Sequence, residues 1–379
     1  MKRLLFIVNG LGLGNATRCH AVIGHLVQRG YTVDVLTSGN GKDYFSSVEE
    51  IDQLISFESL RYGERNGRVS VMATLLLVPQ LVRTLLRNAR LTRRLIRSGG
   101  YRGVVIDSDY TMLAARDRDI PVFAINNADV VVHECRRRKL PRSVYLQYLI
   151  EWADAWFHRA APDRVLSPVA ANMWPDTEDI RHIPPLVRPF LAARPPARKA
   201  RRILVMLSGS GFASHTGFLE RLRLPPGIAI DVIGGEGENT PTVTYHGKVY
   251  GNADLLEAAD IMVVNGGFSA VSEAMVLRKP VVVLPIENHA EQFINAETVE
   301  LLGLGLMADQ IGAPVAIARI VDQFEEFTRA HQTSQIPSDG AAVAADLIVE
   351  WIAGEGETLA MRRGRLLPFA RFPKRARPG

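Results

Sequence analysis

The sequence has few cysteines and no long apolar run. Two cysteines among 379 residues are too few for a disulfide framework, so we expect a reducing compartment and a cytoplasmic protein. No stretch is long enough to cross a bilayer as a helix, and the apolar run at residues 3–8 ends too early for a signal peptide. We therefore expect a protein that is soluble or lies on the inner face of a membrane.

Two kinds of site are also missing from the sequence. The histidines show no two-ligand helix spacing, so no metal is expected. Arginine-rich patches are present without zinc spacing or an aromatic RNA-binding signature, so no nucleic acid is expected as a partner. With 47% apolar and 22% charged residues the composition is globular. The length fits two domains.

Apolar runs alternate with helical patterns in the first half of the chain. Short buried strands are predicted over residues 3–8, 31–37, 103–106 and 122–125. Helices are predicted between them, from about Thr17 to Arg29 and from about Tyr110 to Arg118. Strands that alternate with helices indicate an α/β fold with parallel sheets and right-handed crossovers.

A segment rich in proline, alanine and arginine divides the chain. The strand-first pattern restarts after it, at Ile203, and continues with predicted strands near residues 228–233, 243–245, 261–264 and 281–284. The predicted organisation is an N-terminal domain over 1–190, a linker over 191–202, a C-terminal domain over 203–340, a helix over 341–353 that returns to the first domain, and a basic irregular tail over 354–379.

The most informative segment begins at Asn265 and ends at Ala296. It reads as a glycine turn after a buried strand, then a helix start, a strand ending at Leu284 and a polar loop. Unpaired backbone N–H groups and the helix dipole at such a turn favour an anion. Glu273 inside the first helical turns cannot bind phosphate, and a carboxylate there suits sugar hydroxyls. The segment therefore predicts a nucleotide-sugar site.

A second glycine-rich loop follows the first strand and contains Gly10, Gly12 and Gly14. It is a poor dinucleotide fingerprint, because the third glycine of that motif would fall on Asn15 or Thr17. A tight strand-to-helix turn is the simpler interpretation. Arg18 at the helix start opposes the helix dipole, and we favour an anion-facing role for it over a salt bridge.

Together these segments resemble the GT-B glycosyltransferases of the family that contains the MurG-type and UDP-glucuronosyltransferase-like enzymes (family 28-like). The resemblance rests on the first glycine loop, the run Val105 to Tyr110, the turn Ser208-Gly209-Ser210 and the segment 265–296. The resemblance implies two Rossmann-like parallel-sheet domains that face a central cleft. It also implies hexosyl transfer from a UDP-sugar to a hydroxyl acceptor, which can be lipid-linked, by an inverting reaction without a metal or other cofactor.

The resemblance also assigns donor contacts to particular positions. Glu273 would accept hydrogen bonds from the ribose hydroxyls, with an ordinary exposed helix glutamate as the alternative. Backbone N–H groups for the diphosphate would come from Gly266, Gly267, Phe268 and Ser269. Contacts to the rest of the donor would come from Ser210 with Gly209 (nucleotide), the segment 247–249 that ends at Val249 (uracil), and Gln292 and Asn295 (sugar). The alternative role for Asn295 is to cap a helix or to stabilise a turn.

One departure from the family pattern concerns the catalytic base. The MurG-type loop ends in a histidine, and Asn15 stands there in this sequence. An amide does not accept a proton at neutral pH, although Asn15 can orient an acceptor or bridge to phosphate. We expect the base to be Asp109, then Asp107, both at the carboxyl end of a strand, then His133 with Glu134. A helix cap is the alternative for Asp109.

Five arginines follow helical spacing and form what we call the arginine row, Arg83, Arg87, Arg90, Arg94 and Arg97. A basic amphipathic helix fits adsorption to an anionic membrane, and a domain helix with solvated arginines is the alternative. Two further functions are compatible with the fold: a UDP-sugar 2-epimerase, and a non-catalytic glycosyltransferase-like subunit, which Asn15 suggests.

Overall fold

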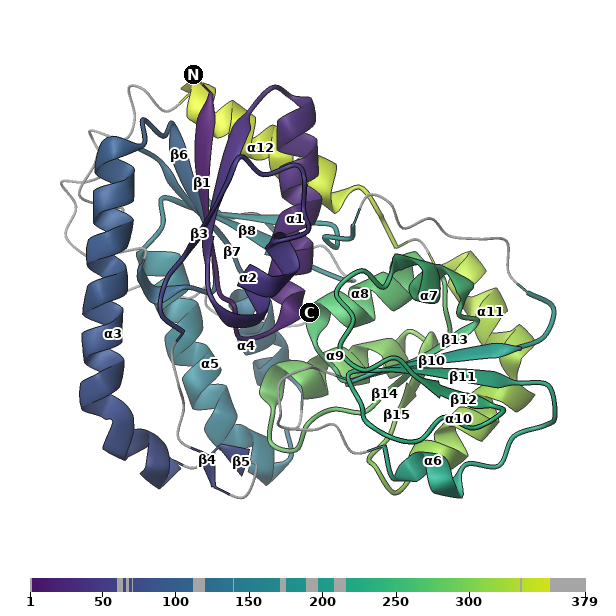
Figure 1. Ribbon diagram of the computed structural model, residues 1–379. Helices are drawn as coiled ribbons and strands as arrows, with labels where there is room; N and C mark the ends of the chain where they lie inside the picture. The colour runs from purple at the N-terminus through teal and green to yellow at the C-terminus, as the bar shows by residue number, and fades with distance from the viewer. Residues whose placement is uncertain are drawn as a thin grey trace, which may run out of the picture.

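The chain folds into two α/β domains that lie side by side (Figure 1). The computed structural model describes residues 2–59, 64–65, 68–69, 71–111, 120–138, 140–170, 175–188, 197–207, 216–334 and 336–354. Each domain contains a parallel sheet with helices on its faces. The predicted class, two Rossmann-like parallel-sheet domains, is confirmed.

The sheet of the N-terminal domain contains seven parallel strands in the order β3-β2-β1-β6-β7-β8-β9. Its central strands are continuous apolar runs, as expected for a sheet that is covered on both faces. The strands are β1 (Arg3–Val8), β2 (Thr32–Thr37), β3 (Gln53–Ser56), β6 (Gly103–Asp107), β7 (Val122–Ile125), β8 (Arg164–Pro168) and β9 (Ile180–Ile183). A separate two-stranded ribbon joins β4 (Glu64–Arg65) to β5 (Arg68–Val69).

The sheet of the C-terminal domain contains six parallel strands in the order β12-β11-β10-β13-β14-β15. The strands are β10 (Arg202–Met206), β11 (Ala229–Ile233), β12 (Val243–Tyr245), β13 (Ile261–Val264), β14 (Val281–Val283) and β15 (Gly305–Met307). In both sheets the first strand of the domain lies inside the sheet. The loops after β1 and β13 therefore open at the carboxyl edges, where ligands bind in such folds.

Helices cover both sheets. Those of the N-terminal half are α1 (Leu13–Gln28), α2 (Gly39–Phe45), α3 (Val71–Ser98), α4 (Ala128–Arg137) and α5 (Arg142–Ala160). Those that follow are α6 (Phe218–Arg221), α7 (Ala253–Ala258), α8 (Phe268–Val276), α9 (Ala290–Leu301), α10 (Ala313–Asp322), α11 (Phe324–Thr333) and α12 (Gly340–Gly354).

The first helix begins earlier than the sequence indicates. We expected it from about Thr17, but α1 starts at Leu13, so Asn15 lies in its first turn. The loop before it is short because its backbone packs against the chain after β2. A side chain at Gly10 would collide with the carbonyl group of Ser38, so only glycine fits there.

Helix α12 belongs to the core of the N-terminal domain although it follows the C-terminal domain in the chain (Figure 1). It packs against α1, and the Trp351 ring lies 5.5 Å from the ring of Phe123 on β7. An ion pair of 2.6 Å joins Arg29 to Asp346 on the outside. The N-terminal domain is thus built from both ends of the described chain.

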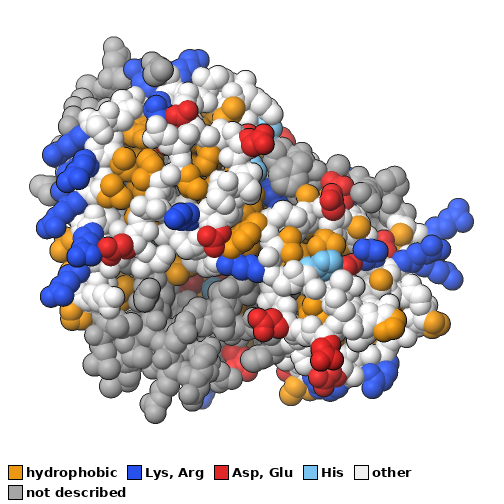
Figure 2. Space-filling model, in the orientation of Figure 1, with side chains coloured by type: hydrophobic (Ala, Val, Ile, Leu, Met, Phe, Trp, Pro, Cys, Tyr) orange, Lys and Arg blue, Asp and Glu red, His pale blue; other side chains and the backbone are white. Residues whose placement is uncertain are grey.

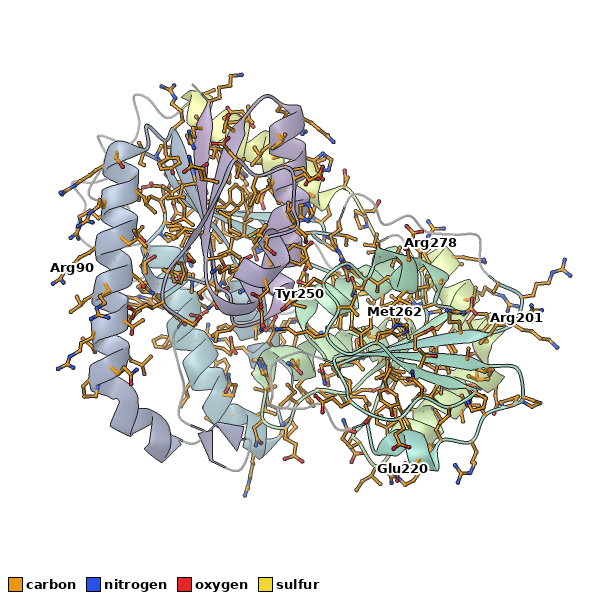
Figure 3. The ribbon with its side chains drawn as sticks, in the orientation of Figure 1. Arg90, Arg201, Glu220, Tyr250, Met262 and Arg278 are labelled. Carbon is orange, nitrogen blue, oxygen red and sulfur yellow. The ribbon has the colours of Figure 1, made fainter. Side chains whose placement is uncertain are left out.

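The arginine row lies on the exposed face of α3. Figure 2 shows this row as a line of basic side chains along one edge of the molecule. In Figure 3 the labelled Arg90 points outward from α3, away from the rest of the protein. The opposite face is partly polar: Thr84, Asn88 and Thr92 are buried together with Ile96. Among the residues that the structure describes, no helix is long and apolar enough to cross a membrane.

Candidate active site

A cavity of about 290 Å³ lies between the domains, at the carboxyl edges of both sheets. Residues of the first glycine loop and α1 face residues of α8, α9 and the segment after β12 across it. The structure brings together at this cavity ten of the residues that the sequence predicts: Gly12, Gly14, Asn15, Arg18, Val249, Gly267, Phe268, Ser269, Glu273 and Gln292.

Two helices begin at this cavity. The N-cap residues are Gly12 for α1 and Gly267 for α8, and neither helix has a side-chain cap. The two starts touch, because the Ser269 hydroxyl donates a hydrogen bond of 2.9 Å to the carbonyl oxygen of Gly14. Uncapped first-turn N–H groups from two helices therefore point at one space. Such a place binds an anion.

Gly266 and Asn295 shape the donor side without lining the cavity. The Asn295 amide donates a hydrogen bond of 2.8 Å to the carbonyl oxygen of Gly266. A side chain at Gly266 would collide with the backbone of Gln292, so glycine allows α9 to approach the turn. The buried Asn295 side chain thus fixes the turn, which is the alternative named for it, and its predicted sugar contact stays a prediction.

Gln292 is held by one end of its amide. Its Oε1 accepts a hydrogen bond of 2.9 Å from the backbone N–H of Ile286. No described residue binds its amide nitrogen, and Gln292 lines the cavity. The hydrogen bond to Ile286 therefore fixes the Gln292 amide at the wall of the space where the sequence places the sugar.

Glu273 is not the exposed helix glutamate of the alternative interpretation. It is 4% exposed, and its Oε1 accepts a hydrogen bond of 2.8 Å from Nε of Arg188. Burial alone would lower the pKa of Arg188, but Glu273 and Tyr44 outweigh it and hold that pKa above its ordinary value. Sequence reasoning missed Arg188, whose only signal was a basic residue at the end of the first domain.

Arg18 and Asp107 form a buried ion pair beside the cavity. Nε and Nη2 of Arg18 each lie 2.5 Å from a carboxylate oxygen of Asp107, which also accepts a hydrogen bond from the Cys19 thiol. Burial alone would lower the pKa of Arg18, but the Asp107 carboxylate raises it above its usual range. The salt bridge that we had ranked second for Arg18 is therefore correct. Asp107 is not available as a base, because both its oxygens hold Arg18.

Asp109 lies close by, at the end of β6, but outside the cavity wall. Its Oδ1 accepts hydrogen bonds from the N–H group of Thr111, 2.7 Å away, and from the Thr111 hydroxyl. Burial raises the pKa of Asp109, although these hydrogen bonds oppose the shift. Its Oδ2 has no hydrogen-bond partner among the described residues. Asp109 therefore has one oxygen that forms the turn and one to which no described residue binds.

Other predicted residues lie at the rim or outside the described chain. Lys248, next to Val249, donates a hydrogen bond of 2.6 Å to Asn40, and the Tyr250 hydroxyl donates one of 2.8 Å to Asp43, so this rim joins the two domains. His133 is exposed on α4, and Glu134 is engaged by Arg138 at 2.8 Å. Gly209 and Ser210 lie outside the described residues.

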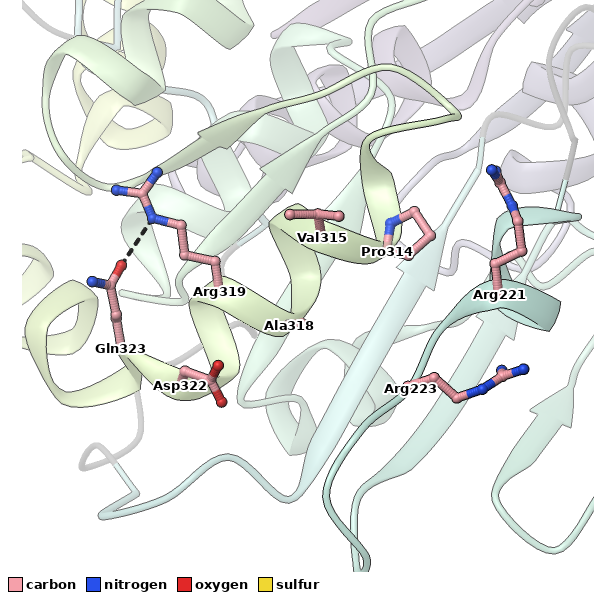
Figure 4. A pocket seen from close by; sticks show the side chains of 8 residues that line it. All are labelled: Arg221, Arg223, Pro314, Val315, Ala318, Arg319, Asp322 and Gln323. Atoms are coloured by element: carbon pink, nitrogen blue, oxygen red, sulfur yellow. Dashed lines mark hydrogen bonds between the residues drawn. The ribbon is translucent and has the colours of Figure 1, made fainter.

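A second hollow, of about 600 Å³, lies on the outer surface of the C-terminal domain (Figure 4). It is lined by Arg221, Arg223, Pro314, Val315, Ala318, Arg319, Asp322 and Gln323. None of these belongs to the predicted site, and Val315 is 73% exposed, so the hollow is open to solvent. The smaller cavity between the domains has the built-in polar groups of a binding site.

The cavity and the two-domain architecture together define a GT-B glycosyltransferase. The model of glycosyl transferase family 1 matches residues 2–324, and the chain belongs to this family. An uncharacterized glycosyltransferase of Methanosarcina mazei is 26% identical over 366 residues, which cover 89% of this chain and 94% of that relative.

Solved structures share the fold. The calicheamicin glycosyltransferase CalG4 matches with a TM-score of 0.63 and 18% identity, covering 94% of this chain and 99% of its own. Arabidopsis thaliana UGT89C1, crystallised with UDP, matches with a TM-score of 0.60 and 13% identity. The match covers 93% of this chain and 100% of UGT89C1. The chain is an enzyme that transfers glycosyl groups.

Proposed function

We propose that the enzyme transfers a hexose from a UDP-sugar to a hydroxyl acceptor. The observation that carries this proposal is the pairing of two uncapped helix N-termini with the carboxylate of Glu273 around one cavity. The helix starts suit a diphosphate, whereas the carboxylate suits ribose hydroxyls. That UGT89C1 was crystallised with UDP supports the choice of nucleotide.

The proposed reaction inverts the anomeric centre without a metal. The acceptor hydroxyl, on the side of the N-terminal domain, gives its proton to the proposed base Asp109 while its oxygen bonds to the anomeric carbon and the bond from that carbon to the diphosphate breaks. Charge that develops on the leaving diphosphate is stabilised by the N–H groups at the starts of α1 and α8, which are already in place before the reaction. Gln292 orients the sugar, and the segment that ends at Val249 holds the uracil.

A thermal-shift screen tests the donor proposal. A ligand that binds only the folded protein stabilises it by about 2.7 kcal/mol at a concentration of 100 times its Kd. We expect UDP and a UDP-sugar to raise the Tm, and ADP to leave it unchanged. Incubation with the UDP-sugar alone then separates the alternatives: an epimerase converts the sugar without an acceptor, and a non-catalytic subunit consumes no donor. No Tm change with millimolar UDP would refute the proposal.

Replacing Glu273 by Gln tests the ribose contact. Hydrogen bonds to a charged group contribute about 1.5–3 kcal/mol. We therefore expect the Kd of UDP, measured by titration calorimetry at low temperature, to rise about 10- to 100-fold. Glu300→Gln, an exposed position on α9, is the matched control and should bind UDP normally. An unchanged Kd in folded Glu273→Gln would contradict the assignment.

We further propose that the arginine row binds anionic membranes, which would bring a lipid-linked acceptor to the cleft. Each arginine near an anionic surface contributes about 1 kcal/mol. The triple variant Arg83→Gln, Arg87→Gln, Arg90→Gln should therefore bind phosphatidylglycerol vesicles about 100-fold more weakly in co-sedimentation. The triple variant Arg221→Gln, Arg223→Gln, Arg319→Gln removes the same charge from the other domain and is the control. Equal loss in both variants would point to net charge alone.

A further inference from the structure

Arg188 is a buried side chain with several partners at the boundary between the domains. It lies just after β9, where the chain leaves the N-terminal domain, and it is 3% exposed. Its Nε donates to Glu273 and its Nη1 donates to Oδ1 of Asn252, each over 2.8 Å. Both acceptors belong to the C-terminal domain, so the guanidinium is fixed from two directions.

The N-terminal domain holds the same guanidinium through Tyr44 on α2. The hydroxyl of Tyr44 is near enough to Arg188 to raise the pKa of the guanidinium, and it lies 2.8 Å from Nδ1 of His20 on α1. Burial raises the pKa of Tyr44 to about 12, so the hydroxyl stays neutral at physiological pH. Arg188 therefore cannot turn away from Glu273 without breaking contacts in both domains.

The arrangement leaves one oxygen of Glu273 for a ligand. Arg188 binds Oε1, whereas Oε2 has no hydrogen-bond partner among the described residues and Glu273 lines the cavity. A glutamate that is held at one oxygen loses the rotation of its carboxylate plane, which an isolated glutamate retains. A ligand hydroxyl then meets an acceptor whose direction is already set, and less ordering is needed on binding.

We infer that Arg188 is a positioning residue that aims Oε2 of Glu273 at the 2′-hydroxyl of the nucleotide and so selects a ribonucleoside diphosphate over its 2′-deoxy form. The inference rests on the proposed function, because it concerns the same donor site. When a ligand lacks the 2′-hydroxyl, Oε2 of Glu273 receives no hydrogen bond. Binding sites that are built to bond a hydroxyl bind analogues without that hydroxyl much more weakly.

A purely structural ion pair makes a different prediction. If Arg188 only held the domains together, its loss would weaken UDP and 2′-deoxy-UDP equally and would leave their ratio unchanged. A positioning role changes the ratio, because only UDP carries the hydroxyl that uses the aimed oxygen. The ratio of the two Kd values therefore separates the two roles.

The test is titration calorimetry with UDP and 2′-deoxy-UDP on the full chain. The wild type should bind UDP about 10- to 100-fold more tightly, as expected for one hydrogen bond to a charged group. Arg188→Met should bring the ratio close to one, mainly by weakening UDP. Arg188→Lys keeps the positive charge with a different geometry, and it provides the measurement if the methionine variant does not fold. It should lower the ratio at least threefold.

The control is Arg202→Met, which removes an arginine from an ion pair with Asp231 elsewhere in the C-terminal domain and should keep the wild-type ratio. A wild-type ratio in folded Arg188→Lys and Arg188→Met overturns the inference and leaves the proposed function intact. A wild type that binds UDP without preferring it also overturns the inference. A wild type that binds neither nucleotide overturns the proposed function and this inference with it.

Discussion

Asp109→Asn is expected to lower kcat by about 10²- to 10⁴-fold, the usual contribution of a general base. We keep Asp109 as the proposed base because no described residue binds its Oδ2, whereas both oxygens of Asp107 hold Arg18. The affinity for UDP should remain within about threefold of the wild-type value, because Asp109 belongs to the acceptor side. Steady-state kinetics and calorimetry measure the two quantities separately.

The pH dependence provides a second readout for Asp109. A base must be deprotonated, so kcat/KM increases as the pH rises through its pKa. Burial raises the pKa of Asp109 above the ordinary aspartate value. The wild-type rate should therefore fall at a higher pH than an exposed carboxylate would give, and Asp109→Asn should lack this fall. Asp346→Asn, at an exposed carboxylate, is the control. If Asp109→Asn kept full turnover, Asp109 would not be the base, and its role would be limited to forming the turn with Thr111.

Asp107→Asn is expected to lower the free energy of unfolding by about 3–5 kcal/mol, because it leaves a buried guanidinium without its counter-charge. Arg18 is 5% exposed and Asp107 is fully buried, so water cannot replace the lost partner. A loss of this size corresponds to a Tm that is roughly 10 °C lower. Calorimetry of the variant measures it.

The double variant Arg18→Met, Asp107→Leu separates charge from packing. Replacing a whole buried pair by apolar side chains is often close to neutral. We therefore expect the double variant to regain most of the lost stability. If Asp107→Asn kept the wild-type Tm but lost turnover, Asp107 would have a chemical role and our interpretation of the pair would be wrong.

The sequence predicts the fold well where burial alone determines the structure. Strands β1 and β13 are almost entirely apolar runs, and both ends of each strand are predicted correctly from the sequence. It did not predict β3, whose residues Gln53–Ser56 are half-buried or exposed at a sheet edge, or β15, which has only three residues. Short edge strands are selected by their neighbours in the sheet, so their own residues carry little signal.

The site is predictable to a smaller extent. Motif spacing identified the segments that reach the cavity, because a glycine turn before a helix is determined by neighbouring residues in the sequence. It did not identify the partners of the charged residues, since Arg18 and Asp107 are 89 positions apart and Arg188 and Glu273 are 85 apart. Such pairs depend on how the domains come together.

The position of α12 has a consequence for biosynthesis. The hydrophobic surface of α1 that Ala344, Ala345 and Ile348 cover remains open until the ribosome has made the whole second domain. During that interval the first domain is an incomplete intermediate with an exposed apolar face, the kind of species that chaperones protect. The core of the N-terminal domain is therefore completed only after α12 has been synthesised.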